Sequence, residues 1–175
     1  MPSKSLDSGE RVLAKLEQLR LLRPTDSALR HSLPEDESVL LLRLCAREAL
    51  VGGISVDFGV RPDELIGPLL SLVSGSAREL RVLDSLSSPI PELIVSYRGQ
   101  TQSWHVVGLK ELIGELNRLF QGDPLAGAIV ILGEWDEMLQ LWCLGKNQLA
   151  SLMKEDFFRA ENRSELSTVF QRGVH

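Results

Sequence analysis

The change of hydrophobic period at Pro89-Ile90-Pro91 constrains the fold of this chain more than any other feature. Two prolines around one residue cannot continue a helix, because proline lacks the backbone N–H and its ring clashes with the preceding turn. Before the break, apolar residues recur mostly at the three-to-four spacing of amphipathic helices, and after it short apolar runs are separated by turn sequences. We therefore expect a helical segment over residues 1–86 and a sheet unit over residues 91–157.

The residues before the break predict helices joined by short connections. An amphipathic pattern over residues 9–23 ends at Pro24, which disfavours a helical residue before it. Two later helices are introduced by capping-box sequences, in which a serine is followed three residues later by a glutamate. The expected helices span residues 9–23, residues 62–73 and a short segment from the Ser76–Glu79 box to Leu86. A further helix starts at the Ser32–Glu35 box and is apolar from Val39 to Leu50. Residues 54–58 are expected to form a short strand or an extended connection.

The residues after the break predict two strand–turn–strand units, each followed by a glycine and a helix. Residues 93–97 and 102–107 flank the turn sequence at Arg98, and residues 128–132 and 138–144 flank the turn 134–137. Two similar supersecondary units need similar residues at similar places, so the likeness is compatible both with one shared hydrophobic pattern and with a true duplication. At an offset of 37 residues the matches are Gly108 with Gly145, Leu112 with Leu149, Leu116 with Met153, Phe120 with Phe157, Leu93 with Val130 and Val95 with Leu132.

Together these elements predict an α+β fold in which an N-terminal helical layer packs with a C-terminal ββαββα unit. We expect that unit to form one four-stranded, mainly antiparallel sheet with both of its helices on one face. The run 128–132 is apolar without alternation, which is typical of a central strand. Residues 1–86 are expected to share the core of the sheet, and residues 158–175 to form a short helix or a tail.

Composition and charge make several classes of function unlikely. The chain of 175 residues has 19 Lys+Arg and 24 Asp+Glu, a net charge of −5, so it lacks the basic surplus that phosphate binding requires and we expect no nucleic-acid partner. No apolar run approaches the roughly 20 residues that cross a bilayer, and the first residues lack the apolar core of a signal peptide. Cys45 and Cys143 are far apart in apolar runs, which predicts two buried, reduced thiols in a cytoplasmic protein.

Motifs that would identify a reaction or a cofactor are absent from the sequence. It has neither a phosphate-binding nor a dinucleotide-binding glycine pattern, and three histidines with two cysteines offer little for a metal site, so we assign no catalytic residue, cofactor or metal. Ser103 and His105 share one face of a predicted strand but lack an orienting carboxylate, and we interpret them as an exposed strand face. Asp57 lies in an apolar stretch, where a turn before Pro62 is favoured over a buried carboxylate.

The acidic turn at Glu134–Glu137 is the main candidate site. Its carboxylates resemble the ligands of divalent cations, but their spacing is not that of a calcium loop, and solvated turns commonly carry such residues. A tryptophan among exposed acids is also suited to anchor a basic protein. We therefore predict a partner-binding set that combines this turn with two aromatic residues near the first hairpin: Glu134, Trp135, Asp136, Glu137, Tyr97 and Trp104.

These observations favour a small, acidic, non-catalytic protein-binding module, such as an inhibitor or an immunity protein that neutralises a basic toxin or nuclease. One alternative is a homodimeric structural or assembly subunit, in which the helices 9–23 and 39–50 bury apolar surface against a second copy. Another is a small enzyme that uses carboxylates such as Asp57, or Glu134 with Asp136.

Overall fold

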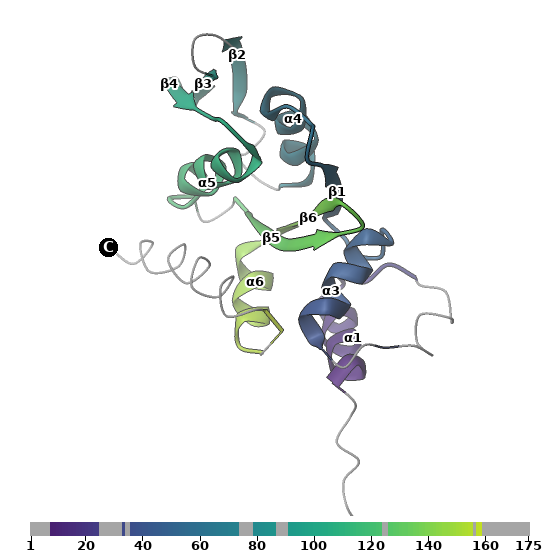
Figure 1. Cartoon of the computed structure of the whole chain (residues 1–175). Helices are drawn as coiled ribbons and strands as arrows, with labels where there is room; N and C mark the ends of the chain where they lie inside the picture. Colours follow the sequence, from purple (N-terminus) through teal and green to yellow (C-terminus); the bar gives the residue numbers. More distant parts are fainter. Residues whose placement is uncertain are drawn as a thin grey trace, which may run out of the picture.

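A computed structural model describes residues 8–24, 33, 36–73, 79–86, 91–123, 126–155 and 157–158 of the chain, and the structural statements below refer to these residues. They form the helices and strands that are labelled in Figure 1. The helices are α1 (Ser8–Gln18), α3 (Glu37–Ala46), α4 (Pro62–Leu72), α5 (Leu109–Phe120) and α6 (Lys146–Met153). The strands are β1 (Gly53–Asp57), β2 (Arg81–Leu86), β3 (Glu92–Tyr97), β4 (Gln100–His105), β5 (Ala128–Trp135) and β6 (Met138–Leu144).

The strands form two separate three-stranded antiparallel sheets, with the orders β2-β3-β4 and β1-β6-β5. The prediction of one four-stranded sheet was therefore wrong, although the fold is α+β. Both predicted hairpins are present as β3–β4 and β5–β6, but they do not pair with each other. Each hairpin pairs instead with a strand that precedes the double proline. β2 extends the hairpin β3–β4, and β1 extends the hairpin β5–β6.

The prediction of a short helix up to Leu86 was wrong over residues 81–86, which form β2; Ser76 to Arg78 of its capping box lie outside the described residues. β2 pairs with β3 from Arg81, opposite Ser96, to Leu86, opposite Glu92. A β-bulge between Val82 and Asp84 shifts the register of this ladder. The bulge inserts one extra residue, so the period of two that identifies a strand is hidden in the sequence.

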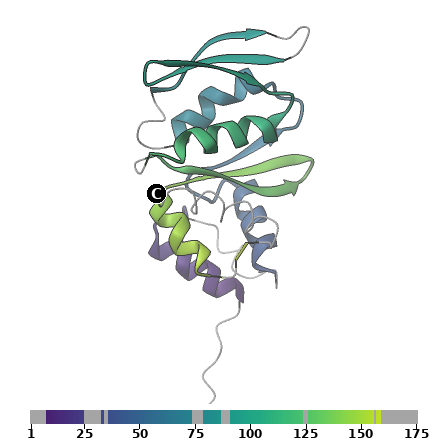
Figure 2. The same ribbon diagram turned by 90° about the vertical axis from the view of Figure 1, so that its left-hand side faces the viewer.

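Figure 2 shows that the elements are stacked in four layers. The sheet β2-β3-β4 is followed by α4 and α5, then by the sheet β1-β6-β5, and finally by α1, α3 and α6. The expected packing of both late helices on one face of one sheet was also wrong. Helix α5 lies between the two sheets, whereas α6 covers the far face of β1-β6-β5.

The sheet β1-β6-β5 is covered by apolar side chains on both faces. Leu141 and Cys143 of β6 join the core cluster of α4 and α5, while Trp142 and Leu144 join the cluster of α1, α3 and α6. This arrangement explains the apolar runs without alternation, which occur in strands that are buried on both sides. The central strand is β6 rather than the predicted run 128–132, which belongs to the doubly covered edge strand β5.

Both hairpins turn at the positions that the sequence predicts, and the structure shows that the two turns share a backbone geometry. Both central residues of each two-residue turn have positive φ, namely 50° and 78° at Arg98 and Gly99, and 50° and 60° at Asp136 and Glu137. Such turns match the right-handed twist of paired strands. Each hairpin is followed by a glycine that caps the next helix, Gly108 before α5 and Gly145 before α6.

The two ββα units also resemble each other in their tryptophans, although these lie 38 and not 37 residues apart in the sequence. Trp104 is the fifth residue of β4 and Trp142 is the fifth residue of β6, so they stand at matching positions after their turns. Trp104 faces the cluster that contains α5, and Trp142 faces the cluster that contains α6. Each helix therefore packs on the same side of its own hairpin, and the two units are stacked in the same orientation.

Two segments with predicted structure, residues 158–175 and the capping box Ser32–Glu35, lie largely outside the residues that the structure describes. Of the segment 158–175 only Phe158 is described, and it is buried next to Phe157 in the core. The capping box Ser32–Glu35 is described only at Leu33, and α3 begins at Glu37 with Asp36 as its N-cap. Within the described part of the chain, no helix combines the length and the apolar composition that spanning a bilayer requires.

Replacement of Gly52 by alanine is expected to lower the free energy of unfolding by roughly 2 kcal/mol or more. Gly52 has φ +84°, and a Cβ at this position would lie 2.3 Å from the carbonyl oxygen of Cys143. The matched control is Gly67→Ala in α4, where a Cβ meets nothing within 4 Å and the free energy of unfolding should rise by about 0.5–1 kcal/mol. Urea unfolding measures both changes, and equal stability of the Gly52→Ala and wild-type chains would contradict this close backbone contact.

Candidate functional site

The turn between β5 and β6 presents three carboxylates, which we call the acidic tip: Glu134, Asp136 and Glu137. All three residues are exposed. Trp135 pairs with Met138 across the base of the turn, is half-buried, and packs against the core cluster of α1, α3 and α6. The tip is therefore a ridge of negative charge with an anchored, partly accessible indole at its base.

Gln140 holds the base of the acidic tip in place. Its side chain is buried, and its amide nitrogen lies 3.4 Å from the carbonyl oxygen of Trp135 and 3.5 Å from that of Met138. Its amide oxygen accepts a hydrogen bond of 2.6 Å from the Ser55 hydroxyl of β1. These contacts connect both ends of the turn to the neighbouring strand. The sequence offers one signal for this residue, since Gln140 is the only strongly polar residue in the apolar run of β6.

The charges of the acidic tip are not neutralised by the part of the chain that the structure describes. Among those residues, no basic side chain lies within ion-pair distance of Glu134, Asp136 or Glu137. Within the same ranges, no group of three or more His, Cys, Asp and Glu side chains could hold a metal ion. The tip therefore offers exposed negative charge to an external cationic group.

Tyr97 and Trp104 are placed elsewhere than the other predicted partner-binding residues. Their exposed fractions are 8% and 2%, and both belong to the core cluster between the two sheets. The indole N–H of Trp104 donates to the Gln102 side chain at 3.0 Å. The structure thus brings Glu134, Trp135, Asp136 and Glu137 together at one turn but leaves Tyr97 and Trp104 inside another layer.

The remaining sequence candidates have structural roles. The Ser103 hydroxyl donates to the Glu92 carboxylate on the neighbouring strand, and the hydrogen bond to His105 that a nucleophile–base pair requires is not formed. Both residues are exposed on the outer face of β4, as expected. Asp57 is exposed at the end of β1 and accepts a hydrogen bond of 2.7 Å from the Gly59 amide, which confirms the favoured turn role.

Comparison of the chain with models of known protein families, with curated protein sequences and with solved structures found no match.

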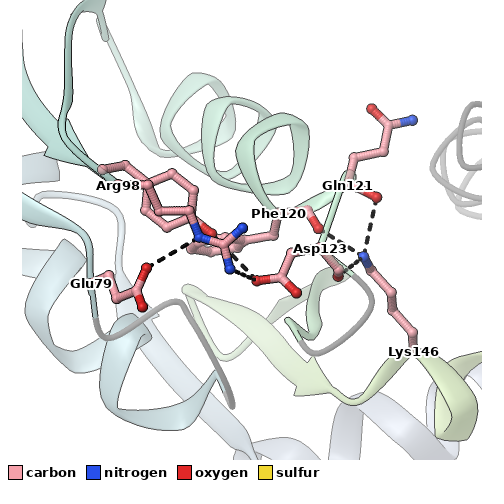
Figure 3. Close-up of polar contacts among 7 residues, drawn as sticks. Glu79, Arg98, Phe120, Gln121, Asp123 and Lys146 are labelled. Carbon is pink, nitrogen blue, oxygen red and sulfur yellow. Dashed lines mark hydrogen bonds and ion pairs between the residues drawn. The ribbon is translucent and has the colours of Figure 1, made fainter.

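A second polar cluster surrounds Asp123, where the chain passes from α5 to β5 (Figure 3). The Asp123 side chain is only 5% exposed and accepts a hydrogen bond of 2.8 Å from the Arg98 guanidinium. The Tyr97 hydroxyl lies 3.5 Å from the same carboxylate oxygen, and Arg98 also pairs with Glu79 at 3.1 Å. This cluster links the β3–β4 turn to the end of α5.

Lys146 completes the cluster from the first turn of α6. Its ammonium group donates to three backbone carbonyls at the end of α5, namely Phe120 at 2.7 Å, Gln121 at 3.2 Å and Asp123. Partial burial lowers the pKa of Lys146, and the nearby Asp123 charge opposes that shift. An ammonium group has three N–H donors, and all three are used here, so the geometry assigns Lys146 to helix capping rather than to proton transfer. Sequence analysis missed this cluster because its members are distant in sequence and belong to no motif.

Replacement of Lys146 by methionine is expected to lower the free energy of unfolding by about 1–3 kcal/mol, because three carbonyl groups at the end of α5 lose a charged donor. The matched control is Lys110→Met in α5, where the side chain is exposed and the change should be within about 0.5 kcal/mol. Chemical denaturation of the two variants measures the difference. Equal stability of the two variants would show that Lys146 does not hold the junction.

Both cysteine thiols are expected to be unreactive in the folded chain. Cys45 and Cys143 are free and buried, and burial raises the pKa of Cys45 to about 11 and that of Cys143 to about 12 from an ordinary value of 9.0. A thiol-specific disulfide reagent at mildly alkaline pH should label neither cysteine until denaturant is added. Rapid labelling of the native chain would contradict the buried positions.

The same pKa values predict how stability depends on alkaline pH. The unfolded chain loses its thiol protons near 9.0, whereas the folded chain retains them up to about 11. The unfolded state therefore binds fewer protons in this window, and the free energy of unfolding should fall as the pH rises. In Cys143→Ala the fall should be shallower, which denaturant titrations at a series of pH values can measure.

Proposed function

We propose that this chain is a non-catalytic protein-binding module that uses its acidic tip to bind a basic surface on another protein. The observation that carries the proposal is the un-neutralised cluster of Glu134, Asp136 and Glu137 on a hairpin whose base is held by Gln140. Because Gln140 holds the backbone at the base of this turn, little backbone entropy is lost on binding, and complementary charges speed association and exclude wrong partners.

Trp135 supports this proposal as the apolar part of the contact. Binding energy in protein interfaces is concentrated in a few residues, among which tryptophan is enriched, and surrounding polar groups set specificity. Trp135 is half-buried against the core and is flanked in sequence by two of the carboxylates. A partner that covers the tip would exclude water from the indole and pair its own Lys or Arg side chains with the acids.

The class of partner follows from the chemistry of the tip. A protein with clustered Lys and Arg side chains, such as a nuclease or a toxin, is complementary to three carboxylates and to a chain of net charge −5. Binding would occlude the basic surface and so inhibit a protein that uses it for activity. We place this interaction in the cytoplasm, where the two free, buried thiols stay reduced.

Neutralisation of the acidic tip is expected to abolish capture of the partner while leaving the fold intact. The test variant is Glu134→Gln with Asp136→Asn and Glu137→Gln, where asparagine also tolerates the positive φ at position 136. The matched control neutralises three exposed acids in other elements, Glu10, Glu48 and Glu111, and changes the net charge equally. Each chain is immobilised and exposed to an extract of the native host, and the captured proteins are identified by mass spectrometry.

We expect the wild-type and control chains to capture one basic protein that the tip variant does not capture. The purified partner should bind the tip variant about tenfold more weakly or worse, and binding to the wild-type chain should weaken as salt is raised. It should also change the fluorescence of Trp135, since Trp104 and Trp142 are only 2% and 0% exposed. Equal capture by the test and control variants, with unchanged melting temperatures, would reject the acidic tip as the binding site.

A further inference from the structure

Strand β2 presents an unusual edge to solvent. All six of its residues are exposed, whereas buried and half-buried residues alternate along its neighbour β3. Val82, Leu83 and Leu86 have exposed fractions of 37%, 57% and 42%, and they are three of the six large apolar side chains that are most exposed in the described part of the chain. No strand within the described ranges pairs with the outer edge of β2.

The opposite edge of the same sheet is different in character. The exposed residues of β4 are all polar: Gln100, Thr101, Ser103 and His105. Polar and charged edges protect a sheet from pairing with another chain, whereas exposed apolar edges favour such pairing. The apolar residues therefore identify β2 as the edge that is suited to accept a further strand.

The order of the charges along β2 indicates what kind of strand can pair with its outer edge. Arg81-Val82-Leu83-Asp84 reads basic, apolar, apolar, acidic, so an antiparallel copy of this segment places each charge opposite its complement and each apolar residue opposite another. Residues three apart in a regular strand lie on opposite faces. The bulge between Val82 and Asp84 removes this obstacle, because Arg81 pairs with Ser96 and Asp84 with Ile94, which lie on the same outer face of β3.

We propose that the chain forms a homodimer through antiparallel pairing of β2 with β2 of a second copy, which joins the two β2-β3-β4 sheets into one. In this two-fold arrangement Arg81 of each copy faces Asp84 of the other, and Val82 packs against Leu83 across the axis. The contact differs from one made by α1 and α3, whose large apolar residues are mostly buried within the chain. It also leaves the acidic tip free, since the tip belongs to the other sheet (Figure 1).

A charge-swap experiment tests the dimer. In the Arg81→Glu variant the introduced carboxylate faces Asp84 at both ends of the interface, and in the Asp84→Arg variant two arginines face each other at both ends. Each variant alone should therefore dimerise about tenfold more weakly or worse, because like charges directly opposite each other repel. In an equimolar mixture, a dimer of one copy of each variant again has opposite charges facing each other at both ends of the interface. The mixture should therefore form this heterodimer. The double variant Arg81→Asp with Asp84→Arg exchanges the charges within one chain and should dimerise like the wild type.

Sedimentation velocity over a concentration series measures each mass, and circular dichroism verifies that the exposed substitutions leave the fold intact. A wild-type chain that stays monomeric over the whole series overturns the proposal. A dimer that persists in both single variants, or a mixture that fails to associate, overturns it as well. Capture of a basic partner by the acidic tip should be unaffected in the monomeric variants, so the two proposals can fail separately.

Discussion

The burial of β6 on both faces is the constraint on which the rest of this structure depends. Every residue from Leu139 to Leu144 is buried, and successive side chains enter different core clusters. A strand of this kind is stable only if an apolar layer covers each side, which places α4 and α5 opposite α1, α3 and α6. The covering helices α4 and α5 are then themselves covered by the sheet β2-β3-β4. Gln140 is the polar exception, and it is accommodated because Ser55 and two turn carbonyls satisfy its amide.

Stacking two ββα units has a polar consequence at their junction. The end of α5 lies beside the first turn of α6, and the last carbonyls of a helix have no hydrogen-bond donor within the helix itself. Lys146 supplies the missing donors from the second unit, and Arg98 supplies a charge partner for Asp123 from the first. Each unit therefore contributes a basic side chain to the same junction (Figure 3). The contact between the two units therefore depends on Lys146, Arg98 and Asp123, which lie outside the matched positions.

The parts of the fold that could be predicted from the sequence are those set by local interactions. The turns at Arg98 and Asp136 and the glycine-capped helices depend on residues within a few positions of one another. The sheet pairing could not be predicted, because β1 joins β6 across about 85 residues, as in the Ser55–Gln140 contact, and hairpin patterns do not show which edge accepts a third strand. The exposure of the aromatic side chains could not be predicted for a similar reason. Trp104 and Trp135 both alternate with polar residues, and only the layer above or below decides which one reaches solvent.

The polar outer face of the sheet β2-β3-β4 sets the direction in which the molecule can associate. The equivalent face of the sheet β1-β6-β5 is apolar and is covered by α4 and α5, so an apolar outer face on the sheet β2-β3-β4 would favour a further helical layer. Its outward residues are instead mostly polar, among them Glu92, Ser96, Thr101, Ser103 and His105. Face-to-face growth of the stack is therefore disfavoured by the cost of desolvating these groups. The proposed edge-to-edge association through β2 would desolvate few of them and would use the exposed apolar residues of that strand, so it would extend the sheet sideways and leave the acidic tip in the other sheet free.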